Sequence, residues 1–459
     1  MNNEKSFRLF IISITSLASF LIAFMSSAIN IALPVIGKEF NSGAVLLSWL
    51  ATAYILTGAV LLIPLGKLSD IYGRSKFLKI GIFVFMIGTL LCGLSGSDTE
   101  LLIFRLFQGL GSSFVFVTLT AILVSAFPVK DRGKILGINV TAVYVGLSSG
   151  PFIGGIITHN IGWRYIFYLS ALIGAAIFIL IMFKLKTEWK EAEGEKFDLT
   201  GSVIYVMSLT FIMLGLTFLP GLHGIALLVI SVIVIYTFFK VESGKEYPVF
   251  NVKVFISNRT FTFSNLSALI NYSATFALTF LLSIYLQNVE GLTAQHAGLI
   301  LVTQPLVMAI FSHVAGRLSD RFEPQIVSSA GMAILTIGLV IFAFINTGYG
   351  IALIISNLVL VGFGFALFSS PNANAIMSSI EKKYYGVASS TLASMRMIGQ
   401  MFSMGIVIVI FALLIGKSVI TPEHNVSFMH SLRLAFIIFS VLSFIGIFTS
   451  LSRGKIHEG

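Results

Sequence analysis

The residues best placed to do chemistry in this sequence form a short charged segment, Gly66–Lys76, between two long apolar stretches. Asp70 and Arg74 stand four residues apart, the spacing at which opposite charges meet on one helix face. Gly66 and Gly73 flank the pair, and glycine permits the geometry of a tight turn. Asp70 can therefore pair with Arg74 or with a helix N-terminus elsewhere in the chain, where the helix dipole favours an anion. A contact made in one conformation and broken in another would set the balance between the two.

A second candidate is the pair Arg105 and Gln108, about one helical turn apart in an otherwise uncharged stretch. If this helix begins near Glu100, a rise of about 1.5 Å per residue places Arg105 roughly 7–8 Å inside it. A guanidinium in hydrocarbon is costly and usually faces an aqueous cavity. The alternative is that the side chain extends to the nearer interface and leaves its charge in water.

A glycine-rich stripe runs from Gly146 to Gly155. Gly146, Gly150 and Gly154 recur every four residues, so they share one helix face and let another helix approach closely. Pro151 removes a backbone hydrogen bond and bends the helix. We expect a smooth, bent surface that slides or rocks against a second half of the molecule. The alternative is ordinary small-residue packing within a membrane bundle.

Polar and aromatic side chains within apolar stretches offer a path for a substrate. They are Asn30, Tyr54, Tyr144, Asn271, Tyr272, Gln304, Asn372 and Asn374, together with a second isolated charge, Arg396. Each can instead form a hydrogen bond between two helices. All 19 acidic residues fall in polar segments or at the ends of apolar stretches. Because a cation loses its hydration in a site without a carboxylate, we expect a neutral, zwitterionic or anionic substrate.

Signatures of other chemistry do not occur in the sequence. It contains no H-E-x-x-H motif and no phosphate-binding G-x-x-x-x-G-K-[ST] motif, and its single cysteine is Cys92. We therefore expect neither an enzyme nor an ATP-driven pump, and no metal site and no cofactor. His313 lies near the end of one apolar stretch, where an imidazole could exchange a proton, although a structural role is the plainer interpretation.

The elements that must position these residues are membrane-spanning helices. Of 459 residues, 56% are hydrophobic and 10% are charged, whereas a soluble domain carries about 25% charged residues. This excludes a soluble enzyme. One span needs roughly 20 residues, so the uncharged stretches predict fourteen spans. These stretches are 9–37, 40–66, 80–97, 106–129, 135–163, 165–183, 199–239 (two spans, divided at Pro220), 260–289, 291–316, 324–380 (two spans, divided near Asn346), 386–416 and 434–452.

The basic residues predict the orientation of these spans. With the N-terminus inside, 23 of the 29 Lys and Arg residues fall in cytoplasmic segments. The exceptions are Lys38, Arg164, Lys417 and Arg433 outside, and Arg105 and Arg396 within spans. This bias predicts that both termini are cytoplasmic, and it accounts for the net charge of +10 without nucleic acid as a partner.

An internal repeat predicts the domain organisation. Gly66–Asp70 recurs as Gly316–Asp320, each time at the end of the second span of a six-span block. The predicted domains are a first bundle over 1–196, a two-helix membrane linker over 197–241 and a second bundle over 242–459. Two related halves of this kind are typical of transporters. We expect segment 184–198 to be a solvated connector, and segment 246–262 to be a short interfacial helix or an ordinary loop.

These motifs together resemble a known family. Segment 66–76 is similar to the signature loop of the major facilitator superfamily, Arg105–Gly111 to its R-x-x-Q-G-x-G motif, and Gly146–Gly155 to the exporter motif G-x-x-x-G-P-x-x-G-G. With fourteen spans, the chain resembles the drug:proton antiporters that include multidrug and tetracycline exporters. The resemblance implies an all-α major facilitator fold in the cell membrane and export of small amphiphiles by alternating access in exchange for protons. It also assigns Arg105, with Gln108 beside it, a role in proton coupling.

One position departs from the pattern of that group. Where the group often has an aspartate in the first span, this chain has Met25, followed by the matching Asn30 and Pro34. The missing acid supports an alternative, an uptake or facilitative carrier of the same superfamily for a small metabolite. A non-transporting membrane sensor or scaffold is disfavoured, because we would expect it to carry a sizeable soluble domain. We expect the carrier to act as a monomer.

Overall fold

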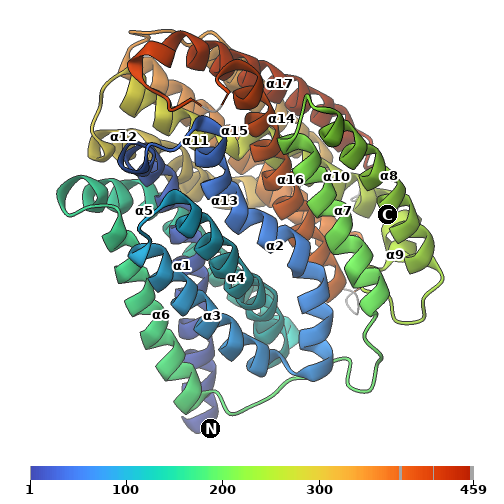
Figure 1. The fold of residues 1–459 in the computed structure, drawn as a ribbon. Coiled ribbons are helices and arrows are strands. Elements are labelled where there is room, and N and C mark those ends of the chain that lie inside the picture. The colour runs from blue at the N-terminus through green and yellow to red at the C-terminus, as the bar shows by residue number, and fades with distance from the viewer. Residues whose placement is uncertain (1, 382–384, 417, 455–459) are drawn as a thin grey trace.

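The computed structural model describes residues 2–381, 385–416 and 418–454, and within these it describes 2–5, 129–134 and 422 by their backbone alone. This part of the chain is helical apart from one isolated β-bridge between Gly43 and Val419 (Figure 1). The helices are α1 Asn2–Phe40, α2 Ala44–Tyr72, α3 Arg74–Leu94, α4 Asp98–Ala126, α5 Val129–Asn160, α6 Arg164–Lys184, α7 Leu199–Thr217, α8 Leu222–Ser243, α9 Val252–Ser257, α10 Arg259–Thr275, α11 Ala277–Ile284, the π-helical turn η1 Tyr285–Val289, α12 Ala294–Leu301, α13 Thr303–Arg321, α14 Pro324–Ala343, α15 Ile351–Ser378, α16 Tyr385–Leu414, the 3-10 turn η3 Pro422–His424 and α17 Asn425–Leu451.

The described residues contain fourteen segments long and apolar enough to cross a membrane, which confirms the predicted count. Two of these spans are interrupted helices: α10, α11 and η1 form one, and α12 with α13 forms another. The two long apolar stretches divide where expected, because α8 begins just after Pro220-Gly221 and α15 begins beyond the polar Asn346–Gly348 segment.

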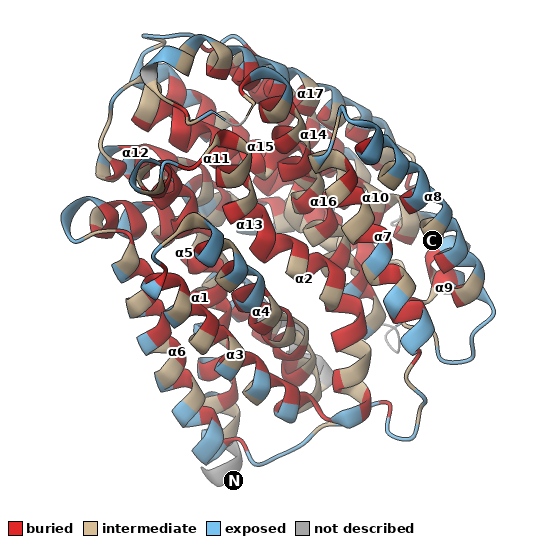
Figure 2. Ribbon diagram, in the orientation of Figure 1, coloured by how far each residue is buried: buried red, intermediate tan, exposed pale blue. Residues whose placement is uncertain are grey.

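The outer surface of the helices is apolar, as a bilayer requires. Phe183 on α6 is 76% exposed, and Val232 on α8 is 66% exposed. Figure 2 shows much of α8 exposed along the edge of the molecule. Large apolar side chains in such number would be unfavourable in water but match lipid tails. Since helices satisfy their own backbone hydrogen bonds, they can present this surface to hydrocarbon.

The spans form two bundles with a helix pair beside them. Helices α1–α6 make the first bundle, and α10–α17 make the second (Figure 1). Helices α7 and α8 pack on each other, and α7 also touches α2 and α16, one helix from each bundle. The order is thus six, two and six, while the boundaries at 196 and 241 stay a prediction. Segment 246–262 contains the six-residue helix α9, with Val252 and Phe255 buried, which favours the helical alternative.

The alternation of spans defines two sides of the molecule. The start of α1, the α2–α3 turn at Gly73 and the end of α17 lie on one side, which we call the near side. The α1–α2 turn around Ser42 lies on the opposite, far side. The assignment of the near side to the cytoplasm stays a prediction, and residues 455–459 of the C-terminal tail lie outside the described residues.

Candidate functional site

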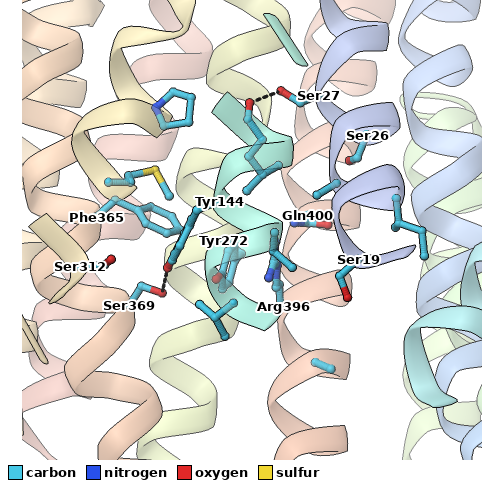
Figure 3. Close-up of a pocket in the computed structure, with 18 of the residues that line it drawn as sticks. Ser19, Ser26, Ser27, Tyr144, Tyr272, Ser312, Phe365, Ser369, Arg396 and Gln400 are labelled. Carbon is cyan, nitrogen blue, oxygen red and sulfur yellow. Dashed lines mark hydrogen bonds between the residues drawn. The ribbon is translucent and has the colours of Figure 1, made fainter. Parts of the chain in front are cut away.

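A cavity of about 950 Å³ lies between the two bundles. Its walls come from α1, α2, α4 and α5 of the first bundle and from α10–α13, α15 and α16 of the second (Figure 3). The lining reaches Met377, one residue from the near-side end of α15, and Ser389, close to the near-side start of α16. The cavity therefore extends from the middle of the membrane spans to the near side.

Glycine and proline backbones close the far side of the cavity. A Cβ atom on Gly298 of α12 would lie 2.1 Å from the carbonyl oxygen of Pro151 on α5. A Cβ atom on Gly155 would lie 2.5 Å from the carbonyl oxygen of Ala294. Both distances are shorter than any van der Waals contact, so only glycine lets the two bundles approach this closely.

Two hydrogen bonds join the bundles at the same end. The backbone N–H of Ala44 donates to the carbonyl of Ser418 at 3.0 Å, beside the Gly43–Val419 bridge. Deeper in, the side-chain amide of Gln287 donates to the carbonyl of Ile31 at 3.0 Å. The chain is thus held closed on the far side and open on the near side.

Most of the predicted path residues line this cavity. They are Asn30, Tyr54, Tyr144, Tyr272, Gln304, Asn372 and Arg396, joined by His313 and Pro151. Asn271 does not line it: the neighbouring Ala268, Tyr272 and Thr275 do, and the helical turn places Asn271 on another face, fully buried. Asn374 is also absent from the lining and donates a hydrogen bond to Ser319 Oγ at 3.2 Å.

Several cavity residues were not among the predictions. The Ser19 hydroxyl donates to Asn139 Oδ1 at 2.7 Å, and the hydroxyls of Tyr144 and Ser369 lie 3.4 Å apart, joining α5 to α15 (Figure 3). Asn139 could have been predicted on the same grounds as Asn30, because it too is an amide within an apolar stretch. The serines carried none, because a serine in a span commonly bonds to its own helix.

The cavity carries a positive charge. Arg396 of α16 contributes the one permanent charge among the described lining residues, none of which is acidic. Its guanidinium carbon lies 5.3 Å from the ring centre of Tyr272 on α10. The described lining therefore offers a cation no carboxylate partner.

Arg105 neither lines the cavity nor extends to the interface. It is 1% exposed, its Nε donates to the carbonyl of Leu50 at 3.2 Å, and its guanidinium carbon lies 4.6 Å from the ring centre of Tyr54. Its terminal nitrogen donates to Gln108 Oε1 at 2.6 Å, and Gln108 donates onward to Thr89 at 2.8 Å. Both alternatives from the sequence are thus wrong, since a closed polar cluster behind Tyr54 satisfies the guanidinium instead.

The charged turn at Gly66–Lys76 contains the expected ion pair. Arg74 Nε donates to Asp70 Oδ1 at 2.7 Å, and Gly73 adopts a φ of +120°, which a side chain rarely allows. Arg74 also approaches Glu191 at 3.3 Å. In this conformation Asp70 therefore pairs with Arg74 rather than with a helix of the second bundle.

The connector after α6 is largely exposed, as a solvated connector should be, but it is also docked on this turn. The carboxylate of Glu188 accepts from the backbone N–H groups of Ser75 and Lys76 at 2.7 and 3.0 Å. Glu195 pairs with Lys67. These carboxylates are attracted by the free N–H groups at the start of α3 and by the basic residues of the turn. The charge pattern of the sequence alone did not predict this docking.

The glycine stripe faces its own bundle. Cβ atoms on Gly146, Gly150 and Gly154 would all fall within about 3 Å of atoms of α1. The three glycines thus share one helix face, but the surface between the halves is formed by Gly155 and the Pro151 carbonyl on the adjacent face. Periodicity identifies which residues share a face, but not which helix lies against it.

Comparison with known proteins identifies the family. A family model described as Major Facilitator Superfamily matches residues 15–404 and, separately, 265–456. The chain belongs to this superfamily. Among its relatives, the riboflavin transporter RibZ of Clostridioides difficile (strain 630) is 33% identical over 375 residues, or 81% of each chain. The multidrug transporter protein MdtP of Bacillus subtilis (strain 168) is 28% identical over 87% of this chain and 74% of its own.

Solved structures show the same fold. A bacterial homologue of the human lysosomal transporter Spinster, solved in an inward-facing and unoccupied conformation, matches with a TM-score of 0.69 at 15% identity over 98% of both chains. The human organic anion transporter MFSD10 matches with a TM-score of 0.65 at 13% identity over 96% of this chain and 99% of that one. At this identity the likeness shows the major facilitator fold alone.

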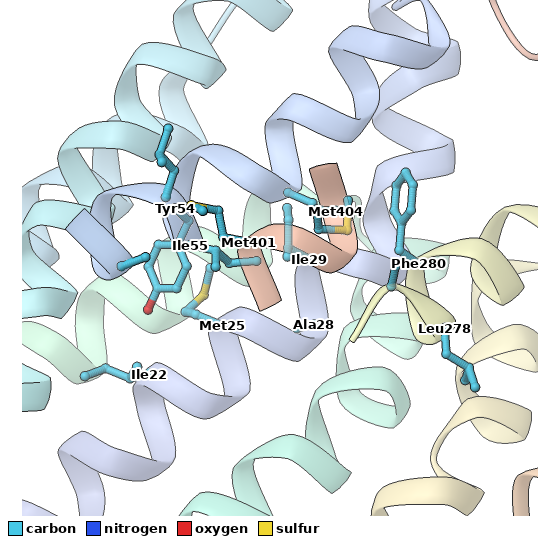
Figure 4. Packing of buried hydrophobic residues seen from close by; sticks show 14 of the residues in the cluster. Ile22, Met25, Ala28, Ile29, Tyr54, Ile55, Leu278, Phe280, Met401 and Met404 are labelled. Carbon is cyan, nitrogen blue, oxygen red and sulfur yellow. The ribbon is translucent and has the colours of Figure 1, made fainter. Parts of the chain in front are cut away.

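Met25 lies in an apolar part of the molecule. It is fully buried, and Figure 4 shows it in an apolar cluster with Tyr54 and Ile55 of α2 and Met401 of α16. Methionine suits such a cluster, because its flexible side chain fills irregular gaps. The position that holds an aspartate in the resembling antiporter group thus belongs here to the apolar packing between the two halves of this transporter.

Proposed function

We propose that this protein exports small amphiphilic molecules without positive charge by alternating access. One observation carries the proposal: a cavity between two bundles is sealed on one side, reaches the other, and has no acidic side chain among its described lining residues. A rocking motion that separates the close contacts at Gly298 and Gly155 would open the far side while the near side closes. The exporter-like stripe at Gly146–Gly155 and relatives named as multidrug transporters support the outward direction.

The driving force in this proposal is the exchange of substrate for protons. The closed cluster of Arg105 and Gln108 lies directly behind Tyr54, which lines the cavity. A substrate or proton that moves the ring of Tyr54 would therefore also disturb the contacts of Arg105. His313 lines the near-side half of the cavity, and an imidazole can accept or release a proton. We place the protein in the cell membrane, as a monomer, with the near side facing the cytoplasm.

A second candidate is uptake or facilitated passage of a metabolite. The lack of a carboxylate among the described lining residues favours it, because a proton-driven exporter commonly needs a titratable acid within the membrane. The relative named a riboflavin transporter supports it as well, since riboflavin is a neutral, aromatic and polar molecule.

Everted membrane vesicles from cells that express the chain distinguish these functions. After respiration has acidified the lumen, a transported amphiphile should release protons from it, and an internal pH dye should report alkalinisation. Vesicles without the protein provide the baseline. Flux that ignores the pH gradient would support the facilitated carrier, and the absence of flux for every compound tested would contradict both.

A further inference from the structure

The charge balance of the cavity is the starting point. Of the described residues that line it, Arg396 alone carries a permanent charge, and no Asp or Glu accompanies it. The structure gives its guanidinium no ion pair among the described residues, only the face of Tyr272 at 5.3 Å. Its N–H groups donate no hydrogen bond to the described residues, so they are available to bind an acceptor.

A buried cation without a counter-ion is unfavourable once water leaves. In the open cavity Arg396 is partly exposed, so water can solvate it. Closure of the near side would remove that water and leave the charge uncompensated. A substrate with one negative charge would compensate it, whereas a cation would add a like charge, which is repelled.

The walls beside Arg396 are aromatic. Tyr272 and Phe365 stand edge to face with ring centres 5.5 Å apart, and Tyr144 approaches from α5 of the other bundle (Figure 3). Tyr144 contacts Ser369 at 3.4 Å, so this corner already joins both halves. Flat rings are favoured against such walls.

We propose that the cavity selects small aromatic compounds with one negative charge and that Arg396 binds that charge. This rests on the proposed function, in which the cavity is the substrate site. Arg396 is then the residue that determines specificity for charge, and Tyr272 orients its guanidinium. A doubly charged anion fits less well, because it would leave one negative charge uncompensated in the closed cavity.

The test uses the purified full chain in proteoliposomes and three probes with the same ring: 2-naphthoate, 2-naphthamide and 2-naphthylmethylammonium. Initial rates give the KM of each probe. A charge-assisted hydrogen bond corresponds to about 10- to 100-fold in affinity. The wild type should favour the acid over the amide by that factor and the ammonium least.

Variants locate the charge recognition. Arg396→Gln should raise the KM of the acid about 10- to 100-fold and change that of the amide less than about threefold. Arg396→Lys should recover part of the preference, because lysine keeps the charge but not the planar fork. Arg433→Gln removes a positive charge outside the cavity, and it should leave the ratio of acid to amide unchanged.

The outcomes distinguish a failure of the proposed charge selectivity from a failure of the proposed transport function. If the wild type moves the amide or the ammonium better than the acid, or if Arg396→Gln affects acid and amide alike, the inference is overturned and the carrier function stands. If the acid is not moved but other amphiphiles are, the inference is likewise overturned. If the chain moves no compound at all, the proposed function fails, and the inference fails with it.

Discussion

Arg105 illustrates how single side chains are satisfied within this membrane protein. Its charge has no carboxylate partner among the described residues, yet Leu50, Gln108 and Tyr54 surround it in a fixed geometry. The contacts depend on the fork of the guanidinium, since Nε and a terminal nitrogen donate in different directions. The cluster therefore fixes the position of Tyr54 at the cavity wall.

Arg105→Lys tests this arrangement at the scale of one residue. Lysine cannot reach Leu50 and Gln108 together, so one buried acceptor loses its partner, at a cost of about 1–3 kcal/mol. We expect a lower temperature of unfolding in detergent and a reduced transport rate. Arg433→Lys, in the far-side half of α17 and exposed, serves as the matched control. Equal unfolding temperatures for Arg105→Lys and wild type would refute the role of the fork.

At the scale of elements, the linker hairpin α7–α8 contains a carboxyl pair. A Cβ atom on Gly201 would lie 1.9 Å from Glu242 Oε1 and 2.7 Å from Asp198 Oδ2, so both oxygens lie in the space that a side chain at this glycine would fill. Asp198 caps α7 by accepting from the N–H of Gly201 at 3.0 Å, and Lys245 approaches it at 3.3 Å. Burial would raise the pKa of Asp198, but the hydrogen bonds from Gly201 and the Glu242 carboxyl and the charge of Lys245 outweigh it and hold the pKa below its usual value.

A pH dependence follows from this lowered pKa. A carboxylate with a depressed pKa stabilises the fold above its unfolded pKa of about 3.9, and the contribution is lost as pH falls through the folded value. Asp198→Asn keeps the cap but removes the charge. We expect it to lower the free energy of unfolding by about 1–3 kcal/mol at pH 7, with the difference shrinking below about pH 4. A difference that grew at low pH would contradict this account.

The contact of α5 with α12 predicts a conformational effect. Gly298→Val places atoms where the Pro151 carbonyl lies, so the far side cannot close as observed. We expect the population to shift away from the near-side-open state, with reduced transport and greater far-side labelling by membrane-impermeant reagents. Gly386→Val is the matched control, because a Cβ at Gly386 would meet no atom within 4 Å. Unchanged labelling of Gly298→Val would show that this contact does not control closure.

At the scale of the whole molecule, the sequence predicted the number of spans and their breaks, because apolar length is a direct requirement of the bilayer. Most of the path residues that it predicted do line the cavity, since side chains such as Tyr144, Gln304 and Arg396 are conspicuous in apolar stretches. It did not predict the facing partner of a helix: Asn271 and Asn30 give the same signal, yet one is buried away from the cavity that the other lines. The sequence did not predict that the connector docks on the turn, because this contact depends on backbone N–H groups at the start of α3 whose position is known only from the structure.

The central claim is that the two bundles rock against each other, so that the far-side contacts break as the near side closes and the cavity opens to each side in turn. Double electron–electron resonance tests it most directly, with Cys92 first replaced by alanine and spin labels attached to cysteines at Ile138 and Ser390 on the near side or at Lys38 and Ser418 on the far side. With a transported substrate present, the account predicts that the near-side distance shortens while the far-side distance lengthens. Distances that stay unchanged, or that change in the same direction on both sides, would contradict it.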